Sequence, residues 1–155
     1  MTSSQKKTEK NTLRIGIAGW SYADWRGIVY PDPMPRGISE LQMIASWFDV
    51  AEINTSYYGI PRPRMAERWL PQIEPFPDFR FTAKLYQGFT HERRYNAWDA
   101  RAFHDFLRPL HEADRLEALL VQFPWSFKWS EKNWSHAARL FEEFRAYPLV
   151  MEIRH

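Results

Sequence analysis

Short apolar runs alternate with segments of helical periodicity along most of this chain. The apolar runs span residues 13–18, 50–54, 79–85, 118–123 and 149–154. Runs of this length are typical of strands, and no Asn-Gly or comparable hairpin turn separates them. Strands that alternate with helices form parallel sheets against which the helices pack. The pattern therefore predicts an α/β fold with five parallel strands and four helices.

Helical periodicity puts the four helices between the apolar runs. They are expected to begin near residue 39 and to cover 64–70, 98–116 and 133–146. Ser39 and Gln42 have the spacing of a capping box, which marks the start of the first helix. Pro109 is expected to kink or divide the third, because proline removes a backbone donor. The fourth helix has an apolar stripe that comprises Trp134, Ala137, Ala138, Phe141 and Phe144.

Polar side chains interrupt four of the apolar runs near their carboxyl-terminal ends. They are Glu52, Asn54, Thr82, Lys84, Gln122, Glu152 and Arg154. In three of the runs they lie two positions apart and therefore share one face of the strand. This face is predicted to line a polar interior at the strand ends, where α/β sheets and barrels build their sites. The plainer alternative is that these residues only satisfy one another, with Lys84 paired to Glu52 or Glu152.

An aromatic-rich loop follows the first run. Trp20, Ser21 and Tyr22 come directly after it, and Trp25 and Tyr30 lie within the same stretch. The first three are expected to form a loop on the ligand side of the sheet. The other two are expected to hold that loop against the fold, because not every aromatic ring can face a ligand.

Composition narrows the class of protein. The 155 residues suffice for one domain, and the absence of cysteine excludes disulfides, thiolate zinc sites and a cysteine nucleophile. A net charge of +2 is too weak to indicate a nucleic-acid binder by itself. Residues 1–12 read as a disordered leader without the apolar core of a secretory signal, and no run is long enough for a membrane helix. The expected location is the cytoplasm.

Five sequence blocks occur in order along the chain. They are GWSYADWRGIVYP (19–31), AEINTSYYGIP (51–61), AKLYQGFTHERR (83–94), QFPWSFKW (122–129) and MEIRH (151–155). Together they resemble the YecE-like family, domain of unknown function 72 (DUF72), over nearly everything after residue 12. The resemblance implies a bacterial or archaeal TIM-type (β/α) barrel without an established activity, whose blocks lie at the carboxyl ends of successive strands.

Two departures from the family pattern change what is expected of this chain. Tyr58-Gly59 stands where the family usually has an aromatic residue followed by arginine, so a site that uses that arginine would be altered. Family members also continue past the fifth block, and a complete barrel needs roughly 200 residues or more. Residues 13–155 are therefore expected to form about the first half of one barrel domain, as in a truncated fragment. Its fifth strand would be an unpaired edge through which the chain could self-associate.

The leading functional hypothesis is a site for a small polar ligand, either sugar-like or anionic. Glu52 and Glu152 would act as acid and base, with Lys84 as an electrophile or as the group that keeps one carboxylate ionised. Aromatic rings from the loops, Trp125 among them, would stack on the ligand. The ligand-binding candidates are Trp20, Ser21, Tyr22, Asn54, Tyr57, Tyr58, His91, Gln122, Arg154 and His155. Whether the chain is an enzyme stays open at this point.

Three alternatives remain. Glu52, His91, Glu152 and His155 include donors that suit a divalent metal, although no spacing motif supports one and no cofactor is otherwise indicated. Basic residues beside tyrosines resemble a stacking platform for nucleic acid, as in Arg93-Arg94-Tyr95, but a solvated rim that attracts an anionic substrate is the preferred interpretation. The chain could also be a folded remnant without activity. His104 and His111 are interpreted as surface residues.

Overall fold

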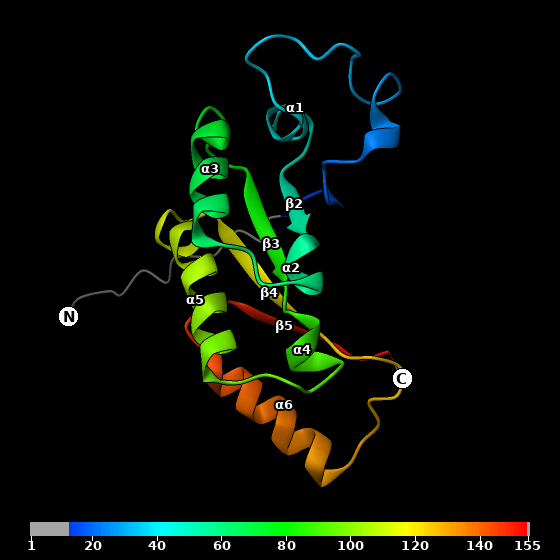
Figure 1. The fold of residues 1–155 in the computed structure, drawn as a ribbon, viewed down its shortest axis with the longest axis vertical. Helices are drawn as coiled ribbons and strands as arrows, with labels where there is room; N and C mark the ends of the chain where they lie inside the picture. Colours follow the sequence, from blue (N-terminus) through cyan, green and yellow to red (C-terminus); the bar gives the residue numbers. More distant parts are fainter. Residues whose placement is uncertain (1–12, 155) are drawn as a thin grey trace, which may run out of the picture.

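The five predicted strands form one parallel sheet in the order in which they occur in the chain. The computed structural model describes residues 13–154; the predicted leader 1–12 and His155 lie outside the described residues. The strands are β1 (Gly16–Ala18), β2 (Val50–Ile53), β3 (Arg80–Lys84), β4 (Leu116–Gln122) and β5 (Leu149–Glu152). Every neighbouring pair is parallel, in the order β1-β2-β3-β4-β5. The prediction of an α/β fold is confirmed (Figure 1).

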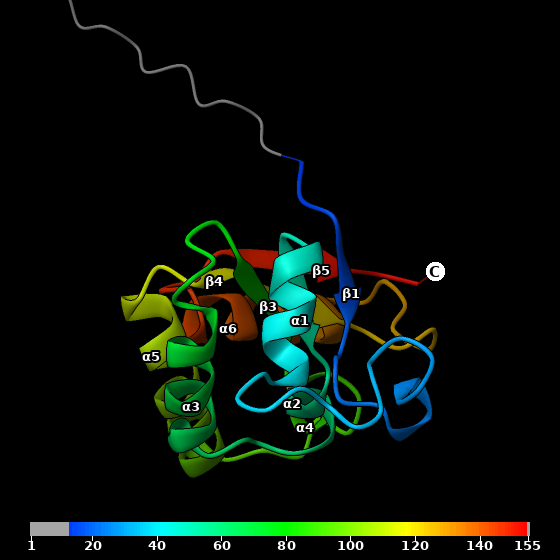
Figure 2. The ribbon, with the colours of Figure 1, turned by 90° about the horizontal axis from the view of Figure 1, so that it is seen from above.

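Four longer helices connect successive strands, as predicted. They are α1 (Glu40–Trp47), α3 (Pro63–Ile73), α5 (Ala97–Glu112) and α6 (Glu131–Glu143). The 3₁₀ turn η1 (Ala23–Trp25) and the short helices α2 (Thr55–Tyr58) and α4 (Gln87–Thr90) were not predicted. Helices α2 and α4 follow the carboxyl ends of β2 and β3 directly. The longer helices lie on one side of the sheet (Figure 2).

The predicted start of α1 is confirmed in atomic detail. The Ser39 hydroxyl accepts a hydrogen bond from the backbone N–H of Gln42 at 3.2 Å. The side-chain oxygen of Gln42 accepts in turn from the backbone N–H of Ser39 at 2.8 Å. This reciprocal pair satisfies two donors that would otherwise be left without partners at the helix end.

The third predicted helix ends earlier than expected and is continuous. Helix α5 ends at Glu112, and Leu116 belongs to β4. The helix passes through Pro109 without being divided. Its neighbours Leu107 and Leu110 are fully buried, so core packing holds the helix together where one backbone hydrogen bond is missing.

The predicted core stripe of α6 is only partly correct. Ala137 and Phe144 are buried, but Trp134 and Ala138 are exposed. His136 and Leu140 take their place in the core. The side-chain nitrogen Nε2 of His136 bonds to the carbonyl of Phe89 at 2.8 Å, a polar contact that apolar periodicity does not reveal.

The predicted alternation of the two sheet faces is confirmed for β2 and β3; in β5, Met151 and the following Ile153 are 36% and 47% exposed instead of buried. The residues buried under the helices are Ala51, Ile53, Phe81, Ala83, Leu119 and Val121. Glu52, Thr82 and Lys84 alternate with them on the other face and are only partly buried. Gln122 is aligned with Glu152 across β4 and β5. Polar residues therefore gather on the face that the described helices leave open.

Strand β1 is shorter than the apolar run that predicted it. Leu13 and Ile15 are exposed, and the backbone N–H of Ile15 bonds to the carboxylate of Asp49 at 3.2 Å instead of to a strand. At Gly16 a Cβ atom would lie only 1.9 Å from the carbonyl oxygen of Val50. This close approach of β1 to β2 explains why glycine occupies the strand. No helix within residues 13–154 is long and apolar enough to cross a membrane.

Candidate functional site at the carboxyl ends of the strands

Two of the predicted catalytic residues meet at the ends of neighbouring strands. Lys84 Nζ lies 3.4 Å from Glu52 Oε1, and the two side chains are 21% and 20% exposed. Of the two pairings that the sequence left open, the one with Glu52 forms. Partial burial shields this ion pair from water, so breaking it costs more than for a pair on the open surface.

Glu152 has two other partners. Gln122 Nε2 donates to Glu152 Oε2, and Arg154 Nε donates to Oε1, both at 2.7 Å. The hydrogen bond from Arg154, then that from Gln122, lowers the pKa of Glu152, and the charge of Lys84 adds to the effect. Glu152 therefore stays ionised near neutral pH. It is suited to accepting hydrogen bonds or to stabilising positive charge, and poorly suited to donating a proton.

His91 completes the polar cluster from the end of α4. Its Nδ1 lies 2.9 Å from Thr90 Oγ1, and its ring meets the ring of Tyr57 edge to face, with centroids 5.1 Å apart. Burial lowers the pKa of His91, and the charges of Arg154 and Lys84 lower it further. The imidazole is therefore neutral at pH 7, the state in which histidine accepts a proton.

Helix α2 holds the tyrosine that faces this histidine. Burial raises the pKa of Tyr57, and the neighbouring Tyr58 hydroxyl adds to the effect. Ser56 was not among the predicted residues, yet it is fully buried. Its hydroxyl lies 2.7 Å from the carbonyls of both Ile53 and Lys84, which ties α2 to the end of β3. In the sequence, only its small hydroxyl side chain and its place just after the polar end of a strand could have indicated the role of Ser56.

A cleft of about 620 Å³ adjoins the cluster. Trp20, Ser21, Tyr22, Asn54 and Tyr58 line it together with Lys84. Sequence reasoning missed its far wall, which comes from α1 and α3 and includes Glu40, Met65, Arg68, Trp69 and Gln72. Lys84 is the residue common to the cleft and the ion pair with Glu52. The predicted ligand-binding residues therefore fall into two groups that meet at Lys84.

The aromatic loop after β1 is anchored by its own rings. Trp20 packs edge-on against Trp69 with centroids 5.1 Å apart. Tyr30 is buried, and its hydroxyl donates to the carbonyl of Trp20 at 2.6 Å. Burial raises the pKa of Tyr30 to about 12, so this donor stays protonated. Trp25 lies against both Tyr22 and Tyr30. The expectation that Trp25 and Tyr30 hold the loop in place is confirmed.

Comparison with known proteins assigns the family. The model for the family described as "Protein of unknown function DUF72" matches residues 14–155. The chain belongs to the DUF72 family. It is 29% identical to UPF0759 protein YunF of Bacillus subtilis over 149 residues, which cover 92% of this chain and 51% of YunF. UPF0759 protein YecE of Escherichia coli K12 is 28% identical over 74% of this chain and 39% of its own length.

Solved DUF72 structures share the fold. A family member from Thermotoga maritima superposes with a TM-score of 0.70 at 33% identity and covers 92% of this chain and 55% of its own. One from Enterococcus faecalis gives 0.75 at 28% identity, covering 92% and 51%. The chain spans about half the length of the relatives it matches, in agreement with a partial TIM-type barrel. None of these names states a reaction or a ligand.

Several predicted residues of this DUF72 chain lie apart from the cluster. Trp125 is exposed in the loop between β4 and α6 and does not line the cleft. His155, which completed the candidate metal set, lies outside the described residues. Within residues 13–154 no three His, Asp or Glu side chains are grouped as a metal site requires. His104 was wrongly interpreted as a surface residue: it is partly buried and stacks on Phe144, with centroids 4.8 Å apart.

The basic residues proposed as a nucleic-acid platform have structural contacts. The Arg93 guanidinium lies 5.4 Å from the centroid of the Phe127 ring and donates to Asn133 Oδ1 at 2.8 Å. These contacts join the loop after α4 to the start of α6. Tyr95 packs against the buried ring of Phe89, with centroids 4.7 Å apart.

Proposed function

We propose that the strand-end cluster binds a small polar ligand, sugar-like or anionic, and acts on it by acid–base chemistry. The observation that carries this proposal is the position of Lys84. Its ammonium group pairs with Glu52, lines the cleft and helps to lower the pKa of His91. Lys84 is thus close both to the cleft, which is large enough for a ligand, and to the neutral imidazole of His91. We also propose the cytoplasm as its location, supported by an ordinary charged content of 26% and the lack of cysteine.

Each side chain of the cluster has its own role in the proposed acid–base reaction. His91 takes a proton from the ligand. Its ring is neutral before the reaction because burial, and then two nearby cations, disfavour a charge on it. The protonated Tyr57 hydroxyl beside it donates a hydrogen bond. Lys84 exchanges part of its contact with Glu52 for a contact with a ligand oxygen. Glu52 or the ionised Glu152 then balances the positive charge that develops.

A second candidate, binding without turnover, is favoured by the openness of one side of the cluster. The side chains of Arg154 and Glu152 are 55% and 40% exposed. Water therefore reaches this side, and electrostatic stabilisation of a transition state is weaker in water than in an enclosed site. Measurements of binding and of turnover separate the two candidates.

The binding part is tested by thermal shift against sugars, sugar phosphates, nucleotides and inorganic phosphate. For the compound with the largest shift, we expect Lys84→Met to weaken binding at least tenfold, about 1.4 kcal/mol. Glu52→Gln should change the affinity as well, because it alters the partner of Lys84. Lys132→Met, at an exposed position of α6, is the matched control and should bind normally. Unchanged binding in both cluster variants would refute the site.

The catalytic part is tested with His91→Gln and the ligand found in that screen. We expect binding within threefold of the wild type and a turnover lower by about a hundredfold, the usual contribution of a general base. His111→Gln, at an exposed position of α5, should react like the wild type. Equal turnover of the His91 variant and the control would leave binding as the function of the site.

A further inference from the structure

A second groove, separate from the cleft at the strand ends, lies beside the amino-terminal ends of α3 and α5. We call it the α3–α5 groove. It has a volume of about 580 Å³ and is lined by residues 60–63, by Tyr86 and by five residues of α5 between Trp98 and Asp105. None of the described residues lines both this groove and the cleft.

The helices that form the α3–α5 groove lie in the middle of the helical layer. Helix α3 lies between α1 and α5, and α5 lies between α3 and α6 (Figure 1). The contact of α5 with α6 includes the rings of Phe103 and Phe144, whose centroids are 5.8 Å apart. Because both helices have a neighbour on either side, the shape of this groove does not depend on the outer strands of the sheet.

Two aromatic rings and several apolar side chains line the groove. Ile60 and Pro61 come from the segment before α3. A Cβ atom at Gly88 would lie only 2.4 Å from Cε1 of Tyr86, so glycine leaves room for that ring. Trp98, in the first turn of α5, is 71% exposed. Aromatic side chains that keep an accessible face are suited to stacking on a flat ring.

Helix α5 contributes one continuous face to the groove. Trp98, Arg101, Ala102 and Asp105 follow one another at the spacing of neighbours on a helix surface. The core side of the same helix is a different stripe, in which Phe103 is fully buried. Trp98 and Arg101 are therefore neighbours on the surface of α5 and lie outside the stripe that packs in the core.

The charged side chains of the groove differ in whether they already have partners. Asp99 belongs to the capping box that starts α5, and its Oδ2 accepts a backbone N–H at 2.8 Å. Asp105 pairs with Arg108. Arg62 and Arg101 are exposed and have no side-chain partner within residues 13–154. The two guanidinium groups are thus available to a ligand, while both carboxylates are engaged.

We propose that the α3–α5 groove binds a small molecule that carries a carboxylate or phosphate group on a flat aromatic ring. The ring stacks on Trp98 and Tyr86, and the anionic group accepts hydrogen bonds from Arg62 and Arg101, whose planar guanidinium groups match either anion. A volume of about 580 Å³ lies within the range of small-molecule sites, which are mostly apolar with a few polar groups. This site is distinct from the proposed acid–base site and does not require it.

The test uses two pairs of probes that share a ring but differ in charge. 2-Naphthoate is compared with its neutral amide, 2-naphthamide, and adenosine monophosphate is compared with adenosine. Binding to the 155-residue chain is followed by NMR through the indole N–H signal of Trp98, which the variant Trp98→Ala assigns. We expect a saturable shift with at least one anionic probe, and an affinity about tenfold lower for its neutral partner. The pair that shows this difference tells whether the groove prefers a carboxylate or a phosphate.

Variants identify the groups that bind the probe. Arg62→Met and Arg101→Met should each weaken the anionic probe about tenfold and leave the neutral one nearly unchanged. Trp98→Ala, followed through backbone signals of α5, should weaken both probes, because stacking does not require the charge. Arg139→Met and Trp129→Ala, at exposed positions outside the groove, are the matched controls. Circular dichroism verifies that each variant is folded.

Lys84→Met separates this groove from the strand-end cluster, and it should leave the binding of the probe unchanged. Loss of binding in Lys84→Met with normal binding in both arginine variants would place the probe in the cleft and overturn the proposal. So would the absence of saturable binding of either anionic probe at millimolar concentration. Tighter binding of an acidic peptide, acetyl-Glu-Glu-Phe amide, than of either probe would assign the groove to a protein partner instead.

Discussion

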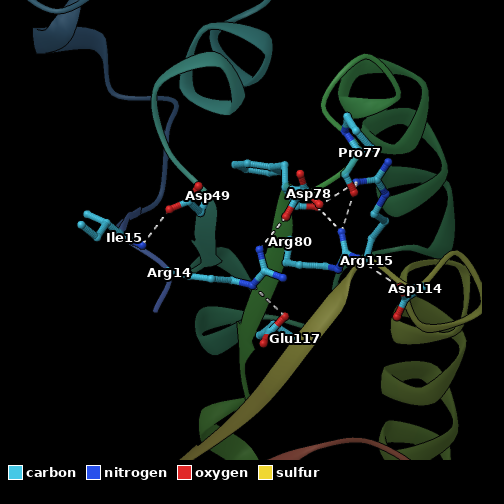
Figure 3. A network of polar contacts seen from close by, with 10 residues as sticks. Arg14, Ile15, Asp49, Pro77, Asp78, Arg80, Asp114, Arg115 and Glu117 are labelled. Atoms are coloured by element: carbon cyan, nitrogen blue, oxygen red, sulfur yellow. Dashed lines mark hydrogen bonds and ion pairs between the residues drawn. The ribbon is translucent and has the colours of Figure 1, made fainter. Parts of the chain in front are cut away.

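Both ends of the sheet carry clusters of charged side chains, but the two clusters use their hydrogen bonds differently. At the amino-terminal end, three arginines surround the loop before β3 and donate to its backbone (Figure 3). Arg115 Nη1 lies 2.7–2.9 Å from the carbonyl oxygens of Phe76, Pro77 and Phe79. Arg14 Nη1 donates to the carbonyl of Asp78 at 2.7 Å.

Carboxylates at this end only complete the network. Arg80 Nη1 donates to Pro77 O at 2.7 Å, and its Nη2 lies 3.1 Å from Asp114. Arg14 Nε lies 3.2 Å from Glu117 Oε2, close enough for an ion pair although the N–H is not directed for a hydrogen bond. The guanidinium groups are thus committed to fixed backbone acceptors, and they serve to hold the loop.

The carboxyl-terminal cluster pairs side chain with side chain instead. Lys84 contacts Glu52, and Arg154 contacts Glu152, so each cation has a partner that can rotate and exchange for a ligand oxygen. Backbone carbonyls offer no such exchange without unfolding of the loop. The contrast teaches that charge density does not identify a site in this fold. The proposed site at the carboxyl ends is supported instead by where the hydrogen bonds of its cations go.

The largest effect is expected from breaking the amino-terminal network. Arg115→Met leaves three carbonyl oxygens without their shared donor and should lower the free energy of unfolding by about 3 kcal/mol. Urea denaturation measures it. Arg145→Met removes an exposed ion pair with Glu142 on α6 and should cost less than about 0.5 kcal/mol.

Equal losses in these two variants would contradict the comparison, because they would show that the loop does not depend on Arg115. A cluster variant such as Glu52→Gln should lie between them, since its ion pair is only partly buried. Stability and ligand binding should therefore respond to different variants. Arg115→Met should affect mainly stability, and Glu52→Gln should affect mainly ligand binding.

A smaller effect, visible in the pH dependence, is expected at His136, which supports the carboxyl-terminal end. Burial lowers the pKa of His136 below its ordinary value of 6.5, although its bond to Phe89 O opposes this. The unfolded chain then binds the proton at a higher pH than the folded chain does. Stability contributed by the neutral ring is present above pH 6.5 and is lost as the pH falls below it.

The variant His136→Gln isolates this contribution. A glutamine amide can replace Nε2 as a donor to Phe89 O but does not titrate. The free energy of unfolding should therefore fall less steeply between pH 7 and pH 5 in the variant than in the wild type, as urea denaturation at each pH reports. His111→Gln is the control and should follow the wild-type slope. Parallel slopes for all three chains would exclude His136 as the source of the pH dependence.

The features that the sequence predicted well follow either from the periodicity of a strand or helix or from the high free-energy cost of burying an unpaired charge. Glu52 and Lys84 lie on the open face because they alternate with buried Ala51 and Ala83, and period two is visible in any strand. Their pairing followed from the cost of leaving a buried charge alone. The capping box at Ser39 is likewise a local pattern, and it needs no knowledge of the rest of the fold.

The features that were missed depend on packing between distant segments. Helices α2 and α4 have four residues each, too few to express a helical period. The far wall of the cleft comes from α3, and Arg68 and Trp69 reach it only through the way α3 packs beside α1. The core face of α6 was misjudged because His136 enters the core through a hydrogen bond to another helix.

The smallest effect on stability, and the sharpest on the site, is expected from Arg154→Met. Arg154 is more than half exposed, so its loss should cost less than about 0.5 kcal/mol. The same guanidinium lowers the pKa of both Glu152 and His91, the first mainly by a hydrogen bond and the second by charge. Both pKa values should therefore rise together in the variant, which NMR titration of the carboxyl and imidazole signals measures.

Arg108→Met tests whether the rise is specific to the strand ends. Arg108 is exposed on α5 and pairs with Asp105, so its removal should leave the pKa values of Glu152 and His91 unchanged. If the pKa of Glu152 rose alone in Arg154→Met, His91 would lie outside the field of Arg154. The cluster would then be two independent ion pairs with a histidine nearby, and His91 would lose one of the two cations that keep its ring neutral.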